Sequence, residues 1–364
     1  MASIREVARE AGVSIATVSR VINGRDSVAP HLRRQVLEAV NRCEYAPAVG
    51  IRSQNSVALI YTGPFTPGSP YDSACIDGMV EAMRESPHDL ILVDMRRDKA
   101  RGETYRQFFA RKGICGAILR STAAERETVE QMADEGLPIV VLGDHFHRPG
   151  LPFVFSESAA ASRQAIEHLL SLGHTRIAFA ACEREDGDHR DRFDAYCSTL
   201  QSRGLFSADL IGRIPPHRLD GEKLIRNLMG MPSRPTAVFI ADPLVAVGAI
   251  NEAHKMGVKI PEDLSIVGFD DTDMRALIYP KMTSVCQDSR MLGRVAFERL
   301  LEKMAGRDAE SPAERGQAAW LEINETTAPP PEIAYHILPN RTRLATSPRH
   351  LEAAIATESP TAAR

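Results

Sequence analysis

From Val57 onward, short apolar runs alternate with segments of helical periodicity, and this alternation constrains the fold more than any other feature of the sequence. Strands separated by helices of this length form βαβ units, in which the strands pair in parallel. We therefore predict an α/β body with two parallel sheets, in which ligands bind beyond the carboxyl ends of the strands. Strands are expected near 57–61, 89–94, 115–119, 138–142, 176–180, 236–241 and 264–269. Helices are expected near 72–85, 101–112, 124–136, 159–172, 190–204 and 243–256.

The first 23 residues have a different pattern, that of two short helices joined by a tight turn. Ser3 and Glu6 form a capping box that begins the first helix. Gly12 lies at the turn, where a positive φ or a close backbone approach is needed. Ser14 caps the second helix, which runs to about Asn23 and directs one apolar face inward. Such a helix-turn-helix places its second helix in the major groove of DNA.

Two short amphipathic helices also occur as an ordinary corner of a helical domain, so the exact residues decide between the two interpretations. The turn reads Ala-Gly-Val-Ser at 11–14, and the second helix continues Thr-Val-Ser-Arg-Val-Ile-Asn-Gly at 17–24. These residues closely resemble the headpiece of the LacI/GalR family of bacterial repressors. The resemblance implies a small all-α helix-turn-helix headpiece over 1–46, with double-stranded operator DNA as its partner.

Further landmarks of the same family follow in the family's order. They are Gly-Ala-Ile-Leu at 116–119, His-Leu-Leu-Ser-Leu-Gly-His-Thr-Arg-Ile at 168–177, Arg-Phe-Asp-Ala-Tyr at 192–196, Pro-Glu-Asp-Leu-Ser-Ile-Val-Gly-Phe-Asp-Asp at 261–271 and Thr-Ala-Pro-Pro at 327–330. The resemblance implies a two-lobed, periplasmic-binding-protein-like body over 57–330 that binds a small effector and forms a homodimer. It also implies that the chain crosses between the lobes three times. One lobe is expected from 57–155 and about 287–312, the other from 156–286 and about 313–328.

The linker at 47–56 departs from the family pattern. Relatives have a short hinge helix there, which orders on operator DNA and inserts a leucine into the minor groove. Laid without gaps, the wedge position is Gln54, and about five residues are missing before the first strand. An amide cannot replace an apolar wedge between base steps. We therefore expect the headpiece to dock on DNA, and leave open whether the linker still kinks it.

On the second helix of the headpiece, Arg20 is expected to read a base, because a guanidinium can donate to both O6 and N7 of guanine. A phosphate contact is its alternative role. Ile15 and Ala16 correspond to the positions by which relatives choose among operators, and as apolar residues they recognise only a thymine methyl or a close fit. The remaining candidates are placed for phosphates, which fix the register of the protein on DNA; they are Ser14, Thr17, Ser19 and Asn23.

The resemblance implies a small-molecule pocket between the lobes. Arg192 and Asp270 match positions that clasp effector hydroxyls or carboxylates, which suits a sugar or another polyol; the alternatives are a solvated arginine and an aspartate that caps a loop. Asp242 stands where relatives usually have an effector-binding asparagine, so an acceptor replaces a donor and acceptor, and the ligand is expected to differ. Tyr71 matches an aromatic residue that relatives stack on the ligand, with core packing as its alternative. Gln287 matches a polar wall position.

Composition and motifs limit the other possibilities. Two histidine-bearing stretches, Asp144–His147 and Asp186–His189, lie in polar connections and do not resemble a closed metal site, so neither a metal nor a cofactor is expected. The six cysteines are scattered, without Cys-x-x-Cys spacing, as in reduced intracellular proteins. Residues 1–53 hold eight arginines against five acidic residues, although the chain has a net charge of −4. This balance fits phosphate contact through the small module only.

The sequence thus predicts a ligand-responsive repressor that acts as a dimer in the cytoplasm, with no signal peptide and no membrane-spanning segment. A sugar-binding transport receptor would share the body but not the headpiece. An enzyme would need a phosphate-binding, dinucleotide-binding or nucleophile-elbow motif, and the sequence has none of them. A regulator without an effector response stays open because of Gln54, the short linker and the Asp242–Pro243 change. Residues 331–364 are rich in Pro, Thr, Arg and Ala and are expected to be mostly disordered.

Overall fold

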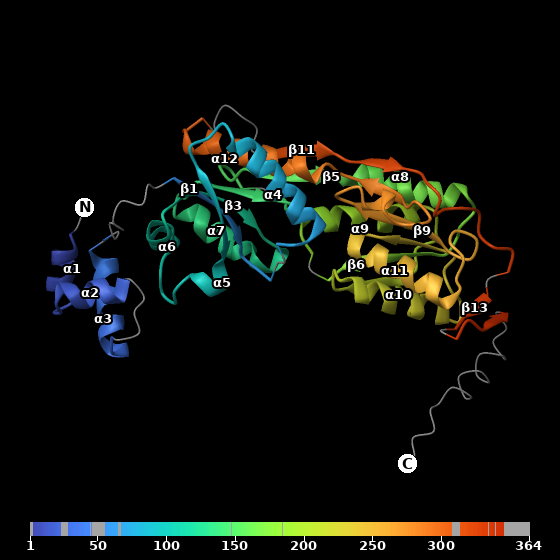
Figure 1. Ribbon diagram of the computed structural model, residues 1–364, viewed down its shortest axis with the longest axis horizontal. Helices are drawn as coiled ribbons and strands as arrows, with labels where there is room; N and C mark the ends of the chain where they lie inside the picture. The colour runs from blue at the N-terminus through green and yellow to red at the C-terminus, as the bar shows by residue number, and fades with distance from the viewer. Residues whose placement is uncertain are drawn as a thin grey trace, which may run out of the picture.

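A computed structural model describes residues 3–22, 28–43, 45, 55–64, 67–146, 148–183, 185–307, 314–333, 335–338 and 340–345. A small helical headpiece lies beside the first of two α/β lobes, and the lobes follow each other along the long axis of the molecule (Figure 1). The predicted fold class, an all-α headpiece with an α/β body of parallel sheets, is confirmed. Among the described helices, none combines the length and apolar character that crossing a bilayer requires.

The headpiece consists of α1 (Ile4–Glu10), α2 (Ile15–Ile22) and α3 (Pro30–Arg42). The capping box is present: Glu6 N–H donates to Ser3 Oγ, and Ser3 N–H donates to Glu6 Oε2. Gly12 has φ of +60° at the turn, and Ser14 Oγ accepts from Thr17 N–H at the start of α2. The three helices close on one apolar core, whose fully or almost fully buried side chains are Val7, Ala8, Ala11, Val18, Val21, Val36, Ala39, Val40 and Tyr45.

The first lobe contains a six-stranded parallel sheet in the order β11-β5-β4-β3-β1-β2. Its strands are β1 (Ser56–Tyr61), β2 (Asp89–Asp94), β3 (Ile114–Arg120), β4 (Ile139–Leu142), β5 (Phe153–Glu157) and β11 (Glu314–Ala318). Its helices are α4 (Pro70–Met83), α5 (Met95–Asp98), α6 (Tyr105–Lys112), α7 (Arg126–Asp134) and α12 (Ser289–Met304). Helices α4 and α12 pack on one face of the sheet, and α6 and α7 pack on the other, so each face has its own apolar core.

The second lobe repeats this arrangement with the order β12-β10-β9-β8-β6-β7. Its strands are β6 (Ile177–Cys182), β7 (Ile211–Ile214), β8 (Ala237–Ile240), β9 (Ser265–Asp270), β10 (Thr283–Cys286) and β12 (Trp320–Glu322), of which β12 runs antiparallel to β10. Its helices are α8 (Ser158–Ser171), α9 (Gly187–Ser202), α10 (Arg218–Gly230) and α11 (Pro243–Met256). The pair α8 and α9 covers one face, and the pair α10 and α11 covers the other.

One expectation about the end of the body is wrong. Residues 314–318 form β11, which pairs with β5 in the first-lobe sheet, so the third crossing occurs at Ala319 and not near residue 313. The sequence of β11, Glu-Arg-Gly-Gln-Ala, is half-exposed and polar, and therefore lacks the apolar signal of a sheet strand.

The expectation that 331–364 is mostly disordered does not hold for β13 (Tyr335–Ile337) and β14 (Arg343–Ala345), which form an antiparallel hairpin. Ile337 is buried in the apolar core beneath α10 and α11, and Arg343 donates to both carboxylate oxygens of Asp263 at 2.9 and 2.7 Å. Composition predicts disorder because it averages over the whole stretch. It does not detect that Ile337 and Arg343 have partners on the second lobe. Residues from 346 onward lie outside the described residues.

Close helix packing in the first lobe depends on two glycines. An added Cβ on Gly293 of α12 would lie 1.9 Å from the carbonyl oxygen of Cys75 in α4, and one on Gly78 of α4 would lie 1.8 Å from that of Arg290. We expect Gly293→Ala to lower the free energy of unfolding by about 1–3 kcal/mol, because the two helix backbones must separate. Urea-induced unfolding followed by circular dichroism measures this change.

The matched control is Gly230→Ala at the end of α10, where an added Cβ would meet no atom within 4 Å. This substitution is expected to leave the stability unchanged or raise it by up to about 1 kcal/mol, because alanine restricts the unfolded chain. Equal effects at the two glycines would contradict the packing argument.

Candidate DNA-binding surface and effector pocket

The exposed face of α2 carries the residues that the sequence predicts for DNA contact. Arg20, Ser14 and Ala16 are exposed, and Ile15 is 45% exposed although its side chain is large and apolar. Thr17 and Ser19 are half-buried at the margin of the same face. Val18 and Val21 fix the helix from below, since both are buried in the headpiece core. The predicted residues Asn23 and Gln54 lie outside the described residues.

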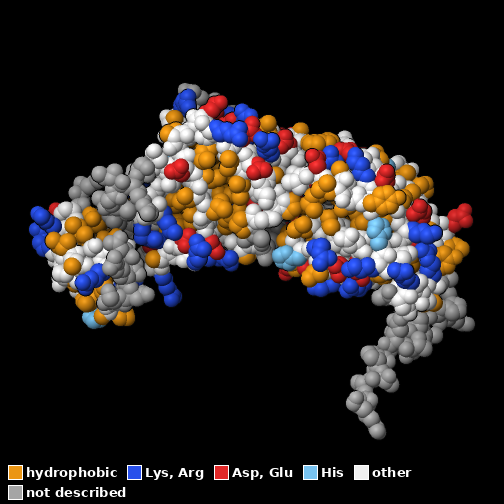
Figure 2. Space-filling view, viewed as in Figure 1, with side chains coloured by type: hydrophobic (Ala, Val, Ile, Leu, Met, Phe, Trp, Pro, Cys, Tyr) orange, Lys and Arg blue, Asp and Glu red, His pale blue; other side chains and the backbone are white. Residues whose placement is uncertain are grey.

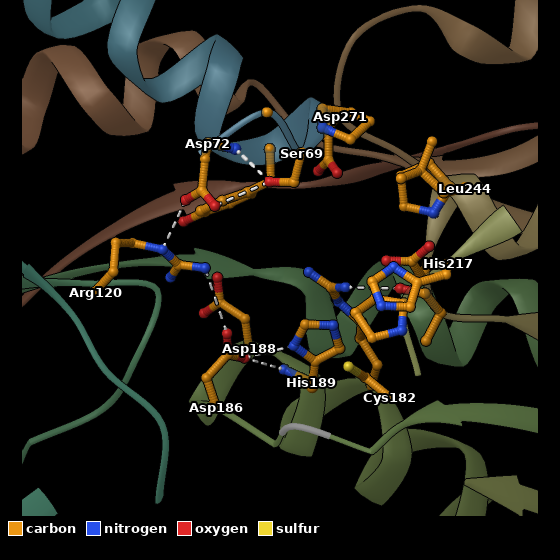
Figure 3. Close-up of a pocket in the computed structure, with 18 residues that line it drawn as sticks. Ser69, Asp72, Arg120, Cys182, Asp186, Asp188, His189, His217, Leu244 and Asp271 are labelled. Atoms are coloured by element: carbon orange, nitrogen blue, oxygen red, sulfur yellow. Dashed lines mark hydrogen bonds and ion pairs between the residues drawn. The ribbon is translucent and has the colours of Figure 1, made fainter. Parts of the chain in front are cut away.

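A pocket with an empty volume of about 900 Å³ lies where the carboxyl ends of the strands of the two lobes face each other. The first lobe contributes the start of α4 and the end of β3; its lining residues are Gly68, Ser69, Pro70, Tyr71, Asp72 and Arg120. The second lobe contributes the start of α9 and the segments after β6, β7, β8 and β9. Its charged lining residues are Asp186, Asp188, His189, Arg192, Asp242 and Asp271. Figure 3 shows Asp72 and Asp271 on one side of this space and Asp186, Asp188 and His189 on the opposite side.

On the first-lobe wall, Arg120 is the central residue, and sequence reasoning missed it. Its Nε donates to Asp72 at 3.0 Å, its Nη1 donates to the Leu142 carbonyl at 2.8 Å, and its guanidinium lies 4.5 Å from the ring centre of Tyr71. Burial opposes its charge, but Asp72 and the other nearby anionic groups outweigh burial and raise the pKa of Arg120 further. Tyr71 thus lines the pocket as predicted, while its ring also supports Arg120. The missed signal is an arginine at the end of an apolar strand.

On the second-lobe wall, Arg192 lies in the pocket as predicted. Its side chain extends from α9 and is only 4% exposed. Its guanidinium lies 3.4 Å from the ring centre of Phe269, and Nη1 donates to the carbonyl of Ala241 at 2.9 Å. The buried Nε atom has no hydrogen-bond partner among the described residues. An unmade hydrogen bond at a buried donor is costly, so an acceptor on a ligand that reached this N–H would be favoured.

Next to Arg192, the start of α9 holds an ion pair. Asp186 caps the helix by accepting from His189 N–H at 2.9 Å, and it also contacts His189 Nδ1 at 2.7 Å. Burial opposes both charges, but the contact between the two groups lowers the pKa of Asp186 to about 2. The same contact raises the pKa of His189 well above its usual value. The pair is therefore charged near neutral pH.

The prediction for Asp270 is wrong in its geometry, since the neighbouring Asp271 lines the pocket instead. Asp270 is the loop-capping aspartate of the alternative interpretation: it accepts from the backbone N–H of Met274 at 2.9 Å and pairs with Arg275 at 2.7 Å. Gln287 also stands outside the lining, where its Nε2 donates to Asp271 at 2.5 Å. Asp242 lines the pocket as predicted and caps α11, accepting from Val245 N–H at 2.9 Å.

The two histidine-bearing stretches meet across the gap between the lobes. Asp144 of the first lobe accepts from Gly187 N–H of the second at 2.9 Å. His145 Nε2 lies 3.3 Å from Asp191 and 3.8 Å from Asp188, both in α9. Among the described residues, His, Cys, Asp and Glu side chains form no group of three or more that could hold a metal ion. These contacts therefore join the lobes.

The inter-lobe contact of His145 has a pH dependence that can be tested. The carboxylates of Asp188 and Asp191 raise the pKa of His145 to about 10 although burial opposes this. Because the folded value exceeds the unfolded value of about 6.5, the pair stabilises the fold fully below about pH 6.5 and loses this effect as the pH rises through about 10. We expect the stability difference between the native chain and His145→Gln to shrink over that range. A double-mutant cycle with Asp191→Asn isolates the pair, and a coupling that stays constant with pH would contradict the assignment.

Comparisons with known proteins agree with this geometry. The model of the family described as bacterial regulatory proteins, lacI family, matches residues 3–48, and that of a periplasmic binding protein-like domain matches 166–327. The transcriptional regulator MalR of Streptomyces coelicolor is 30% identical over 318 residues, which are 84% of this chain and 91% of that protein. Catabolite control protein A of Priestia megaterium is 29% identical over 310 residues, covering 84% and 93%.

A solved structure is also similar to most of the chain. The transcriptional regulator CelR in complex with cellobiose superposes with a TM-score of 0.65 at 26% identity, covering 90% of this chain and 100% of that one. The headpiece match, the body match and the extent of the MalR similarity leave one conclusion: the chain belongs to the LacI family and is a DNA-binding transcriptional regulator rather than an enzyme.

Proposed function

We propose that this regulator is a ligand-responsive repressor that binds a pseudo-palindromic operator as a homodimer. Its operator affinity changes when a small hydroxylated molecule of the sugar class binds between the lobes. The observation that carries the proposal is that both lobes build the pocket, with Arg120 and Asp72 on one wall and Arg192 and Asp242 on the other. A ligand there contacts both lobes at once, so it can favour one arrangement of them over another. Its natural place of action is the cytoplasm, where the operator is.

Exposed apolar side chains support a homodimer. On the face that α4 and α12 present, apolar side chains gather (Figure 2); Val80 of α4 is 39% exposed and Met291 of α12 is 37% exposed. On the second lobe, Leu277 and Tyr279 are each 82% exposed. Clustered apolar residues on a surface are typical of protein contacts. A dimer would present two headpieces to successive major grooves, which matches the twofold symmetry of a pseudo-palindrome.

A regulator that binds DNA without an effector response is the alternative, because Gln54 and Asp242 depart from the family pattern. The pocket argues against this alternative. Arg192 Nε and Asp188 Oδ2 are buried there without a hydrogen-bond partner among the described residues, and such groups cost free energy in an empty pocket. If the protein no longer bound an effector, apolar residues could replace these buried polar groups without loss of function. The sugar class is also consistent with the cellobiose that CelR holds.

Selection of binding sites from a random library of double-stranded DNA tests the proposal. The full-length protein is expected to enrich one pseudo-palindrome, with two protomers on each site. A parallel selection with Gln54→Leu tests the linker, since an apolar side chain can act as a wedge that the amide cannot replace. Absence of enrichment with both proteins, even at low salt where phosphate contacts are strongest, would overturn the repressor assignment.

A further inference from the structure

We propose that the molecule bound between the lobes is a cation, a hydroxylated primary amine of the amino-sugar class. The carboxylates of Asp242 and Asp271 recognise its ammonium group. The inference rests on the proposed function, because it identifies the ligand class of the same pocket. It follows from the balance of charge around the cavity, which the protein's own cations leave incomplete at Asp242 and Asp271.

Three of the five aspartates that line the pocket have cationic partners inside the protein. Asp72 pairs with Arg120 at 3.0 Å, and Asp186 pairs with His189 at 2.7 Å. Asp186 also lies 3.8 Å from Arg120. These four groups form a neutral set that needs no ligand to balance its charge. The third aspartate, Asp188, lies 3.8 Å from His145, whose pKa the carboxylates of Asp188 and Asp191 raise to about 10.

The other two lining aspartates are Asp242 and Asp271, and in the described part of the chain neither lies within ion-pair distance of a histidine, an arginine or a lysine. Asp242 accepts from the backbone of Val245 at 2.9 Å. Asp271 accepts from Gln287 and from Ser289 Oγ, both of which are neutral.

The nearest cations do not balance these two carboxylates. Arg192 is the remaining lining arginine, and it is held by the Ala241 carbonyl and the Phe269 ring. His145 is engaged by Asp188 at 3.8 Å and by Asp191 at 3.3 Å. The pocket therefore leaves two carboxylates, those of Asp242 and Asp271, for one guanidinium.

Independent observations indicate that the excess negative charge of the pocket is balanced by a bound ligand. Asp188 is 2% exposed, and its Oδ2 has no hydrogen-bond partner among the described residues, like Nε of Arg192 on the same helix. Burial raises the pKa of Asp271 to about 6, and burial also raises the pKa values of Asp242 and Asp188. Burial is the largest cause of each shift, so the surrounding donors and cations offset the cost of burying these anions only in part.

An amino sugar fits these requirements better than other ligand classes. Its ammonium group offers three donors and a positive charge to the carboxylates, and its hydroxyl and ring oxygens offer acceptors to Arg192 Nε. A neutral sugar would satisfy the hydrogen-bonding groups but would leave the negative charge of Asp242 and Asp271 unbalanced. An anionic ligand would be repelled by these carboxylates. A metal ion fails on geometry, because the described residues contain no group of three ligands.

Calorimetry with the full-length protein at about pH 7 tests the inference with two matched pairs, D-glucosamine against D-glucose and D-galactosamine against D-galactose. Within each pair an ammonium group replaces one hydroxyl. We expect an amine to bind about tenfold or more tightly than its neutral counterpart, because charge-assisted hydrogen bonds to carboxylates are strong. Lowering the pH to about 5.5 is expected to weaken amine binding, since protonation of Asp271 removes an attracting charge.

Asp242→Asn separates the charge from the shape of the pocket. It is expected to weaken amine binding by about tenfold or more and to leave neutral-sugar binding within about threefold. The matched control is Asp194→Asn, which removes the same charge from an exposed position of α9 outside the pocket, and should leave both affinities unchanged.

Equal affinities within both pairs, or an Asp242→Asn variant that keeps the amine preference, would overturn the inference. If a neutral sugar binds tightly and changes operator affinity, the cationic ligand is wrong while the repressor function stands. If the operator is bound but neither amines nor sugars bind, both the cationic ligand and the effector response are wrong, and DNA binding alone remains.

Discussion

Replacing Arg20 by alanine is expected to weaken binding to the selected operator by about 5- to 150-fold, which corresponds to about 1–3 kcal/mol for the loss of a bidentate contact to guanine. The side chain is exposed on α2, whose opposite face is fixed by the buried Val18 and Val21. The fold should therefore be unaffected, and fluorescence anisotropy with labelled operator measures the change directly.

The same experiment separates base reading from phosphate contact. If Arg20 reads a base, the variant loses discrimination at one operator position while retaining it elsewhere. If Arg20 contacts a phosphate, affinity falls uniformly across operator variants. The slope of log affinity against log salt concentration then decreases in magnitude by about one. Arg42→Ala is the control. Arg42 of α3 carries the same charge as Arg20 and forms an exposed ion pair with Glu10 of α1. A uniform loss equal to that of Arg42→Ala would contradict the base-reading role.

Replacing Arg192 by alanine is expected to lower ligand affinity by about 10- to 150-fold, because hydrogen bonds to charged groups contribute about 1.5–3 kcal/mol. The protein should still bind its operator, since the headpiece is not altered. The expected phenotype is therefore a regulator that stays on or off DNA whatever the ligand concentration. Titration of ligand by calorimetry, together with operator binding by anisotropy, measures both properties in one preparation.

The control for this prediction is Arg190→Ala on the same helix. The Arg190 side chain is 57% exposed and pairs with Glu185 at 3.3 Å, and such a surface pair contributes little. Ligand affinity should therefore change by less than about fivefold. Similar losses for Arg190→Ala and Arg192→Ala would mean that the general charge of α9, and not the buried guanidinium, governs ligand binding.

The sequence predicts the elements that have a strong periodic signal and misses those that depend on tertiary pairing. Helix α11 begins at Pro243 and ends at Met256, as predicted, because a capping aspartate, a proline in the first turn and a glycine after the end all favour the same bounds. Strand β11 is polar and half-exposed, so only its pairing with β5 makes it a strand. The hairpin of β13 and β14 likewise depends on partners in the second lobe.

The pocket follows the same rule. Resemblance places Tyr71, Arg192 and Asp242 correctly in the lining, but it selects Asp270 where Asp271 lines the pocket. Successive residues at the end of a strand point to opposite sides, so an error of one residue exchanges a pocket position for a loop position. In the structure, Asp270 caps the loop and Asp271 lines the pocket. Sequence reasoning misses Arg120 because its role depends on Asp72, which is 48 residues away in the chain, and its one local signal is its place at the end of an apolar strand.

The most direct test of a ligand-responsive repressor is a linkage measurement. The affinity of the full-length protein for its selected operator is measured with and without a saturating sugar or amino sugar that binds in calorimetry, and the affinity for that compound is measured with and without operator. A ligand-responsive repressor should show a change of about fivefold or more, of equal size in the two directions, because coupling between two sites is reciprocal. A compound that binds in the pocket and leaves operator affinity unchanged would mean that the pocket does not control DNA binding.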